Sequence, residues 1–450
     1  MNAQDFFEEL FRLARQRFEE YEVYAVKGES FFAKVTAQKC EKYTVQNTAG
    51  VSFRAKKNGR IGYASSTVFS EESAAALVEN AAKNLEILES KDEQFIFEGS
   101  AHYPSANSYS EELARTTPQQ RIALAMELER QALAASDAVI RTEGSAVGYG
   151  ESEVMIRNSK GLSLQNHCNY LYAYVLPIAE KDGVMNNGFA YAFGRSLSDI
   201  DTTALAAEAV KDAAAQLGAA SCASGTFPIV LRSDTVADLL DTFSDIFSAE
   251  CAQRGLSLLK GREGEMVASS CVTITDDPLC PDAPIRSAFD DEGVAAQTKN
   301  VIENGVLRTL LYDLKTAAKA GVTSTGNGNK ASYTSDIHVA PSNFSLKPGS
   351  ISFEELLCRA ENGILITELN GLHSGANAAT GDFSLSAKGY MIENGKRSRA
   401  VAGITVSGNF YTLLKSILCV GSDFRWGLPG DGTYGAPSIL VSGLSVAGSE

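Results

Sequence analysis

Residues 371–423 read GLHSGANAATGDFSLSAKGYMIENGKRSRAVAGITVSGNFYTLLKSILCVGSD, and residues 435–448 read GAPSILVSGLSVAG. Glycines punctuate extended apolar segments in both stretches, which is typical of short β-strands joined by tight turns. The tetrapeptide Ile-Glu-Asn-Gly ends one such segment at residues 392–395, and it occurs again at 302–305. Asn-Gly pairs favour hairpin turns, because both residues tolerate positive φ. The C-terminal part of the chain is therefore predicted to be rich in β-hairpins.

The N-terminal part mixes helices and strands in blocks. An amphipathic opening helix is followed by strand-like segments at 42–47 and 51–56, an Asn58-Gly59 turn, a helix over 71–88, a helix opened by Thr117-Pro118, strand-like sequence over 137–193 and a helix over 198–217. Blocks of helices and strands, without strict βαβ alternation, favour an α+β fold.

Two domains are expected, because single cores rarely grow beyond roughly 250 residues. The small-residue stretch 218–225 predicts the boundary between them. Residues 1–217 form a domain of helices and mixed sheet, with a sub-boundary near 90–117. Residues 226–450 form a glycine-rich domain that is mostly antiparallel β-structure with a few helices.

Composition excludes several classes of function. The net charge of −15 opposes binding to nucleic acid, which needs a basic surface. No apolar run approaches the roughly eighteen residues of a membrane span, and the amphipathic N-terminal helix has no cationic leader, so a cytoplasmic protein is expected. The eight cysteines show no Cys-x-x-Cys pair, and no two of the four histidines are helical neighbours. A zinc ribbon and a histidine cage from one chain are both disfavoured.

An amphipathic helix is predicted from Asp234 onward. Its apolar side carries Val236, Leu240, Phe243 and Phe247, and its opposite side carries Asp234, Asp238, Asp241 and Asp245. Such a row of carboxylates could bind Mg²⁺ or Ca²⁺, which prefer oxygen ligands. A solvated helix face accounts for the same pattern, and like charges at this spacing repel. Both interpretations stay open.

The chain closely resembles the TldD/PmbA family of metallopeptidases, and in particular its PmbA (TldE) type, whose family label is "modulator of DNA gyrase". The resemblance rests on the two C-terminal stretches quoted above and on motifs in the family's order: the strand and helix from Phe227, Asp290-Asp291-Glu292-Gly293, Asn304-Gly305-Val306-Leu307 and Ser324-Thr325-Gly326-Asn327-Gly328. It covers Phe227 to the C-terminus closely and the N-terminal part more loosely. The acidic charge argues against direct DNA contact.

The resemblance also locates the family's zinc positions in this sequence. TldD-type members carry a His-Glu-x-x-x-His motif, in which two histidines hold zinc and the glutamate is a general base. Those positions fall on Asp241, Thr242 and Ile246, and Gly432-Thr433-Tyr434-Gly435 stands where the family has a cysteine ligand. Isoleucine has no lone pair and threonine is no base near neutral pH. We therefore expect no catalytic residue, no metal and no cofactor in this chain.

The resemblance implies a division of labour between subunits. A TldD-type partner holds zinc, and the PmbA/TldE-type subunit joins it in a complex that cleaves peptides or unfolded proteins. The chain is expected to form a heterodimer with such a partner, or a homodimer, and to bind peptide. Exposed β-edges could hold an extended peptide through backbone hydrogen bonds. Cleft residues are expected at Asp290, Asp291, Glu292, Gly293, Gly326, Asn327, His373 and Ser374.

Two alternatives stay open. An independent hydrolase could use His373 with Ser374 or Asp382, although a histidine in a glycine-rich turn more often fixes a loop. A homo-oligomeric peptide-binding protein is the other alternative. Residues 430–435 match G-x-G-x-x-G, but a strand-like run follows where a dinucleotide site needs a helix.

Overall fold

A computed structural model describes residues 1–87, 95–430 and 432–449. Its N-terminal strands form one antiparallel sheet in the order β3-β2-β1-β4-β5-β6, with β7 also paired to β5. The strands are β1 (Glu20–Thr36), β2 (Lys39–Lys57), β3 (Arg60–Ser66), β4 (Val139–Asn158), β5 (Ser163–Lys181), β6 (Val184–Asn187) and β7 (Ala190–Gly194). Four of them are 17 to 20 residues long, so two separate pairs of helices can pack along the same sheet.

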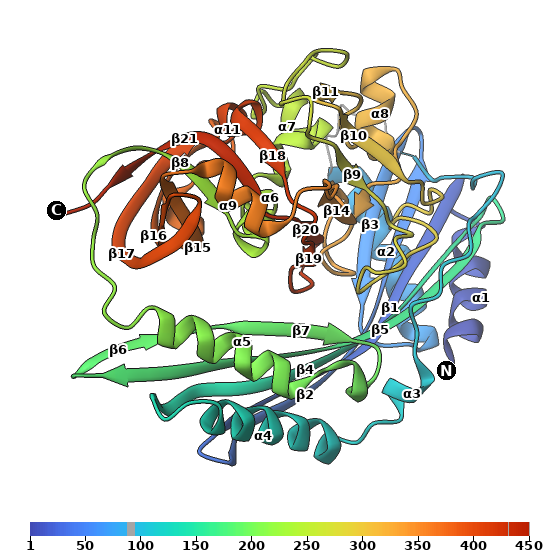
Figure 1. Cartoon of the computed structure of the whole chain (residues 1–450). Coiled ribbons are helices and arrows are strands. Elements are labelled where there is room, and N and C mark those ends of the chain that lie inside the picture. The colour runs from blue at the N-terminus through green and yellow to red at the C-terminus, as the bar shows by residue number, and fades with distance from the viewer. Residues whose placement is uncertain (88–94, 431, 450) are drawn as a thin grey trace.

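Two helical pairs cover this sheet at different places (Figure 1). The helices are α1 (Ala3–Ala14), α2 (Glu71–Ile87), α3 (Glu111–Ala114), α4 (Pro118–Ala134) and α5 (Thr202–Ala215), with a 3-10 turn, η1, at Leu197–Asp199. One core joins α1 and α2 to β1 and β2 through residues such as Phe7 and Phe53. A second core joins α4 and α5 to β1, β4 and β5 through residues such as Phe31 and Leu171.

The C-terminal part contains a closed barrel. Its sheet runs in the order β17-β16-β15-β8-β21-β18, and β17 also pairs with β21, so five strands close on themselves. The strands are β8 (Gly225–Leu231), β15 (Gly363–Asn370), β16 (Asp382–Glu393), β17 (Lys396–Asn409), β18 (Ile417–Val420) and β21 (Ile439–Ala447). Closure removes most free edges from the sheet.

A second sheet packs beside the barrel, in the order β11-β10-β9-β14-β20-β19. Its strands are β9 (Ile274–Asp276), β10 (Lys299–Glu303), β11 (Val306–Leu307), β14 (Asn343–Leu346), β19 (Arg425–Trp426) and β20 (Thr433–Ala436), and β12 (Gly328–Asn329) pairs separately with β13 (His338–Val339). The helices of this part are α6 (Ser233–Thr242), α7 (Ala249–Gln253), α8 (Leu314–Ala320), α9 (Phe353–Ala360), α10 (Leu372–Gly375) and α11 (Phe410–Ser416), with a 3-10 turn, η2, at Ser244–Phe247. A single large core joins α6, η2 and both sheets.

The prediction of an α+β fold is confirmed, and the Asn58-Gly59 turn does join two strands. The segments 42–47 and 51–56 are not separate strands, because β2 runs unbroken through Gly50. A side chain at Gly50 would overlap the Tyr333 ring at 2.4 Å, so glycine here permits close packing and does not break the strand. The helix predicted over 71–88 is α2, whose described residues end at Ile87. Residue 88 and part of the connector predicted over 90–117 lie outside the described residues. The domain boundaries remain a prediction.

Candidate functional site

Helix α6 and turn η2 carry the three residues that stand at the family's zinc positions. Ile246 has no exposed surface and belongs to the large C-terminal core. The hydroxyl of Thr242 donates a hydrogen bond of 2.7 Å to the backbone carbonyl of Asp238. Asp241 is exposed on the same helix. Of the three side chains, only that of Asp241 is of a type that zinc commonly binds.

The stretch that resembles the family's third ligand lies next to this helix, because β20 packs on α6. The Tyr434 hydroxyl donates to the Ser244 hydroxyl at 3.1 Å. Burial raises the pKa of Tyr434, and the nearby carboxylates of Asp241 and Asp245 raise it further, so the phenol stays neutral. The structure thus places the stretch 432–435 beside α6, and its Tyr434 carries a neutral phenol.

These residues do not fit a catalytic zinc site. Zinc needs three protein ligands from histidine, cysteine or carboxylate side chains in a convergent arrangement. Ile246 points into the core, Thr242 is bonded within its own helix and Tyr434 is bonded to Ser244. Across residues 1–87, 95–430 and 432–449, no group of three or more His, Cys, Asp or Glu side chains is placed to hold a metal ion.

The helix predicted from Asp234 onward is only partly as predicted. Val236, Leu240, Phe243 and Phe247 are buried as predicted, but the α-helix ends at Thr242 and a 3-10 turn follows. The tighter turn lets Ile246 and Phe247 both face the core.

Desolvation by surrounding protein raises the pKa of Asp238 to about 7, and repulsion from the Asp234 and Asp241 carboxylates raises it further. Asp238 keeps exposed surface, so this desolvation is partial.

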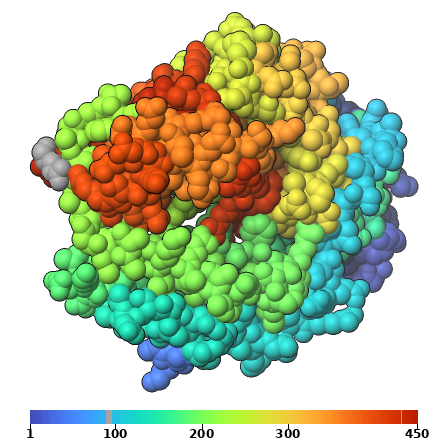
Figure 2. All heavy atoms as spheres, viewed as in Figure 1, coloured from blue at the N-terminus to red at the C-terminus, as the bar shows by residue number. Residues whose placement is uncertain are grey.

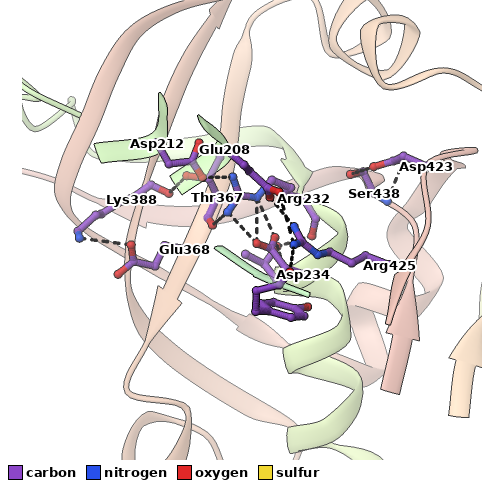
Figure 3. Close-up of polar contacts among 12 residues, drawn as sticks. Glu208, Asp212, Arg232, Asp234, Thr367, Glu368, Lys388, Asp423, Arg425 and Ser438 are labelled. Carbon is purple, nitrogen blue, oxygen red and sulfur yellow. Dashed lines mark hydrogen bonds and ion pairs between the residues drawn. The ribbon is translucent and has the colours of Figure 1, made fainter. Parts of the chain in front are cut away.

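Ion pairs join α6 and the barrel to the N-terminal part (Figure 3). Arg232 lies between Asp212 of α5, at 2.6 Å, and Asp234 of α6, at 2.7 Å. Arg425 pairs with Glu208 of α5 at 2.5 Å. Lys388 pairs with Glu368 within the barrel at 3.3 Å and donates a hydrogen bond of 3.0 Å to Asn187 of the N-terminal sheet. Sequence reasoning missed this network, since its members are far apart in the chain.

A cavity of about 330 Å³ opens beside these pairs, where Figure 2 shows a hollow between the C-terminal part and α5. Its charged lining residues are Asp212, Asp234, Asp238 and Glu368 against Arg232 and Lys388, so carboxylates outnumber cations by four to two. The cavity therefore favours cationic over anionic groups.

The acidic turn Asp290–Gly293 is built into the fold by its own side chains. Asp290 accepts hydrogen bonds from the backbone N–H groups of Glu292, Val294 and Gly328, at 2.8–3.0 Å. The Asp291 carboxylate accepts from the Lys330 N–H at 2.7 Å. Glu292, 5% exposed, accepts from the N–H of Leu314 at 2.7 Å, which is the first residue of α8. Burial raises the pKa of Asp290 and of Glu292. The Asp291 carboxylate raises the pKa of Asp290 further, and the Asp290 carboxylate raises that of Glu292.

The acidic turn shares a cavity with the glycine-rich loop predicted beside it. A space of about 170 Å³ is lined by Asp290, Asp291, Gly326 and Asn327 among others. The Asn327 amide donates to the Asp276 carboxylate at 2.8 Å, and Asp276 also pairs with Lys299 at 2.9 Å. Four of the predicted cleft residues, Asp290, Asp291, Gly326 and Asn327, thus line one cavity, whereas Glu292 lines a separate one.

His373 and Ser374 lie elsewhere, on the short helix α10, and both are exposed. The Ser374 hydroxyl donates to the carbonyl of Gly371 at 3.3 Å. Asp382 accepts from the Asn409 amide at 2.8 Å, so its carboxylate is engaged away from the histidine. The hydrogen bonds of these described residues do not assemble a Ser-His-Asp triad.

A buried lysine beside the acidic turn also escaped sequence reasoning. The Lys330 ammonium donates to the hydroxyls of Ser52 at 3.0 Å and Tyr63 at 3.2 Å, both in the N-terminal sheet. It also lies 4.7 Å from the centre of the Tyr24 ring. Burial lowers the pKa of Lys330 to about 8, and Arg54 lowers it further. Only the strand-like alternation of residues 51–56 hinted at the inward-facing partner Ser52.

Three family models match most of the chain. The "PmbA/TldA metallopeptidase C-terminal domain" matches residues 224–448, the central domain of the same family matches 111–217 and its domain 1 matches 21–85. "Metalloprotease PmbA" of Escherichia coli O157:H7 is 27% identical over 337 residues, which are 74% of this chain and 71% of the relative.

Solved structures share the whole fold. A protein described as a modulator of a DNA gyrase from Thermotoga maritima MSB8 is 32% identical, with a TM-score of 0.92 over 99% of this chain and 100% of that chain. TldE from Thermococcus kodakarensis is 23% identical, with a TM-score of 0.91 over 98% and 100%, and this second likeness concerns the fold alone.

Proposed function

The chain belongs to the PmbA/TldD metallopeptidase family, and from that premise we propose that it is a PmbA/TldE-type subunit of a cytosolic peptidase complex. In this proposal a TldD-type partner supplies zinc, and this chain is not catalytic by itself. The complex acts on peptides or unfolded proteins. Neither nucleic acid nor a membrane takes part. Among the described residues, no helix is both long and apolar enough to cross a bilayer.

One observation carries the non-catalytic assignment. Ile246 is wholly buried in a core that includes Phe243 and Phe247, so the position of a ligand is occupied by a side chain that stabilises the fold. A zinc ligand needs a lone pair directed at the metal, and the isoleucine side chain has none. The stretch 432–435, which stands where the family has a cysteine ligand, offers Tyr434, and its hydroxyl is hydrogen-bonded to Ser244.

The proposed contribution of this chain to substrate binding is a part of the cleft. The cavity at Asp290, Gly326 and Asn327 offers glycine backbone, which an extended peptide can approach closely. The carboxylate-rich cavity beside Arg232 and Asp238 would favour cationic side chains of such a peptide.

The test combines this chain with a zinc-bearing TldD-type subunit from the same organism. We expect a stoichiometric complex on a sizing column and peptide cleavage that disappears when a chelator removes zinc. A control variant replaces the motif glutamate of the partner, which should abolish cleavage while the complex persists. Cleavage by this chain alone that survives chelation would favour an independent hydrolase instead. Failure of the two subunits to associate would refute the proposal.

A further inference from the structure

The cavity beside Arg232 contains one carboxylate that no cation pairs with. Its other three carboxylates each have a cationic partner within 3.3 Å, namely Arg232 for Asp212 and for Asp234, and Lys388 for Glu368 (Figure 3). The fourth carboxylate belongs to Asp238, on α6. Among the residues that the structure describes, the Asp238 side chain forms neither an ion pair nor a hydrogen bond. Asp238 therefore offers the cavity an acceptor without a partner.

The surroundings of Asp238 leave its charge poorly compensated. Desolvation, together with repulsion from the Asp234 and Asp241 carboxylates, raises the pKa of Asp238 to about 7, although Arg232 attracts the charge. A ligand cation beside Asp238 would remove this penalty, because opposite charges attract strongly in a partly desolvated site.

A second acceptor of the same cavity also lacks a partner. Gln216, directly after α5, is 4% exposed and lines the cavity. Its Nε2 donates to the carbonyl of Gly389 at 3.0 Å, and since that carbonyl can only accept, the oxygen of Gln216 is the atom left over. The amide also contacts the Tyr390 hydroxyl, but Oε1 is buried without a hydrogen-bond partner among the described residues. Buried acceptors are normally hydrogen-bonded, so Oε1 is available to a donor on a ligand.

Part of the cavity wall is apolar. Phe189, which is 40% exposed, lines the cavity together with Leu176 and Tyr191. The ring centres of Phe189 and Tyr191 lie 5.7 Å apart. Aromatic rings contact a hydrocarbon stem and also attract a positive charge at its end. The volume of about 330 Å³ lies within the range of roughly 300–1,000 Å³ that is usual for small-ligand sites.

We propose that this cavity binds an organic cation, in which an ammonium or guanidinium group is carried on a hydrocarbon stem. Asp238 pairs with the cationic group, Gln216 Oε1 accepts one of its N–H groups, and Phe189 contacts the stem. An anion would meet the excess of carboxylates. A bare metal ion would lack a set of three converging ligands among the described residues.

The cation has two possible sources, which share this chemistry. One is a lysine or arginine side chain of a peptide, and this source rests on the proposed function, in which the chain binds part of a peptide. The other is a free amine. Both can be measured on this chain by itself, so a failure to associate with a zinc-bearing partner would leave the result unaffected.

Ligand-observed NMR titration of the purified chain at pH 8, where Asp238 is ionised, tests the proposal. The probes are acetyl-alanyl-lysyl-alanine amide, the same tripeptide with norleucine in place of lysine, and butylammonium. Norleucine keeps the hydrocarbon stem of lysine and lacks the ammonium. We expect the lysyl tripeptide to bind with a dissociation constant at least roughly tenfold below that of the norleucyl tripeptide. Tighter binding of the lysyl tripeptide than of butylammonium assigns the cavity to a peptide side chain, and the reverse order assigns it to a free amine.

Two matched variants locate the binding. Asp238→Asn keeps the shape of the side chain and removes its charge, so it should weaken binding of the lysyl tripeptide at least roughly tenfold. Asp245→Asn removes an exposed carboxylate from η2, outside the cavity, and should leave binding unchanged. Both positions are exposed, so both variants should fold, which their melting temperatures check.

Three results would overturn the proposal. The first is no saturable binding of either cationic probe to the unmodified chain. The second is equal binding of the lysyl and norleucyl tripeptides, which needs no variant. The third is a loss of binding in Asp238→Asn that is no greater than the loss in Asp245→Asn.

Discussion

Ile246 stands where the family has a zinc-binding histidine, and its environment is that of a core residue. Ile246→Ala should lower the free energy of unfolding by about 2–5 kcal/mol, because it leaves a cavity that the packed rings of Phe243 and Phe247 cannot fill. Thr242→Ala, one turn earlier, should cost less than about 1 kcal/mol. Urea denaturation of both variants measures the difference. Equal, small losses would show that the Ile246 site is not the tight core that the structure describes.

Glu292 is a second buried residue whose chemistry can be tested, since burial raises the pKa of its carboxyl. The folded chain keeps this proton at pH values where the unfolded chain has released it. The free energy of unfolding therefore falls as pH rises from about 4.5, the ordinary glutamate value, through the raised pKa. Glu292→Gln keeps an oxygen for the Leu314 N–H and removes this dependence.

The free energies of unfolding of the wild type and of Glu292→Gln should thus diverge as pH rises, by on the order of 1 kcal/mol for each pH unit by which burial raises the pKa of Glu292. The exposed Glu86→Gln is the matched control and should follow the wild type. Parallel curves for wild type and Glu292→Gln would contradict the assigned burial.

Hairpin turns are the elements for which sequence and structure can be compared most directly. Gly59 and Gly305 both follow an asparagine and both have positive φ, +75° and +83°. A Cβ at Gly59 would meet nothing within 4 Å, whereas one at Gly305 would lie 2.5 Å from the carbonyl oxygen of Ala268. Both alanine variants should pay roughly 1–2 kcal/mol for the left-handed backbone.

Gly305→Ala should lose more than this, because the carbonyl of Ala268 cannot move without disturbing the neighbouring turn. Thermal unfolding of the two alanine variants, beside the wild type, measures the excess. A similar melting temperature for both variants would mean that the loop at Ala268 yields freely.

Sequence signals predicted the turns and helix starts that adjacent residues determine. Asn58-Gly59 and Thr117-Pro118 are examples, since a turn and a capped helix depend on adjacent residues. The end of α6 at Thr242 could not be predicted, because the 3-10 turn is fixed by core packing of Ile246 and Phe247. The Asp290 turn and the Gly326 loop were predicted through resemblance, but their shared cavity depends on contacts between segments distant in sequence.

At the scale of the whole molecule, hydrogen bonds attach the N-terminal sheet, and the connector that carries Tyr103, to the segment around the acidic turn. The Tyr24 hydroxyl donates to Asp291 at 3.1 Å, Tyr103 donates to the carbonyl of Gly293 at 2.7 Å and Tyr63 donates to the carbonyl of Tyr333 at 2.5 Å. Tyrosine suits such a junction, since its ring packs while its hydroxyl bonds. The predicted cleft residues are therefore held by the N-terminal sheet, and a change in that sheet can reach them.

Lys330 is the charged member of this junction and gives it a pH dependence. Its pKa is lowered to about 8 by burial, below the usual 10.5, so between these values the folded chain has released a proton that the unfolded chain still holds. The free energy of unfolding should therefore rise with pH from about 8 to 10.5, by on the order of 1–3 kcal/mol.

Lys330→Met keeps the aliphatic stem between Tyr24 and Tyr63 and removes the proton, so its free energy of unfolding should lack this rise. Denaturation at pH 7 and 9.5 measures it, with the exposed Lys347→Met as control. If Lys330→Met and Lys347→Met gained equal stability between the two pH values, the ammonium would not be buried at the junction, and the two parts of the chain would be held together without it.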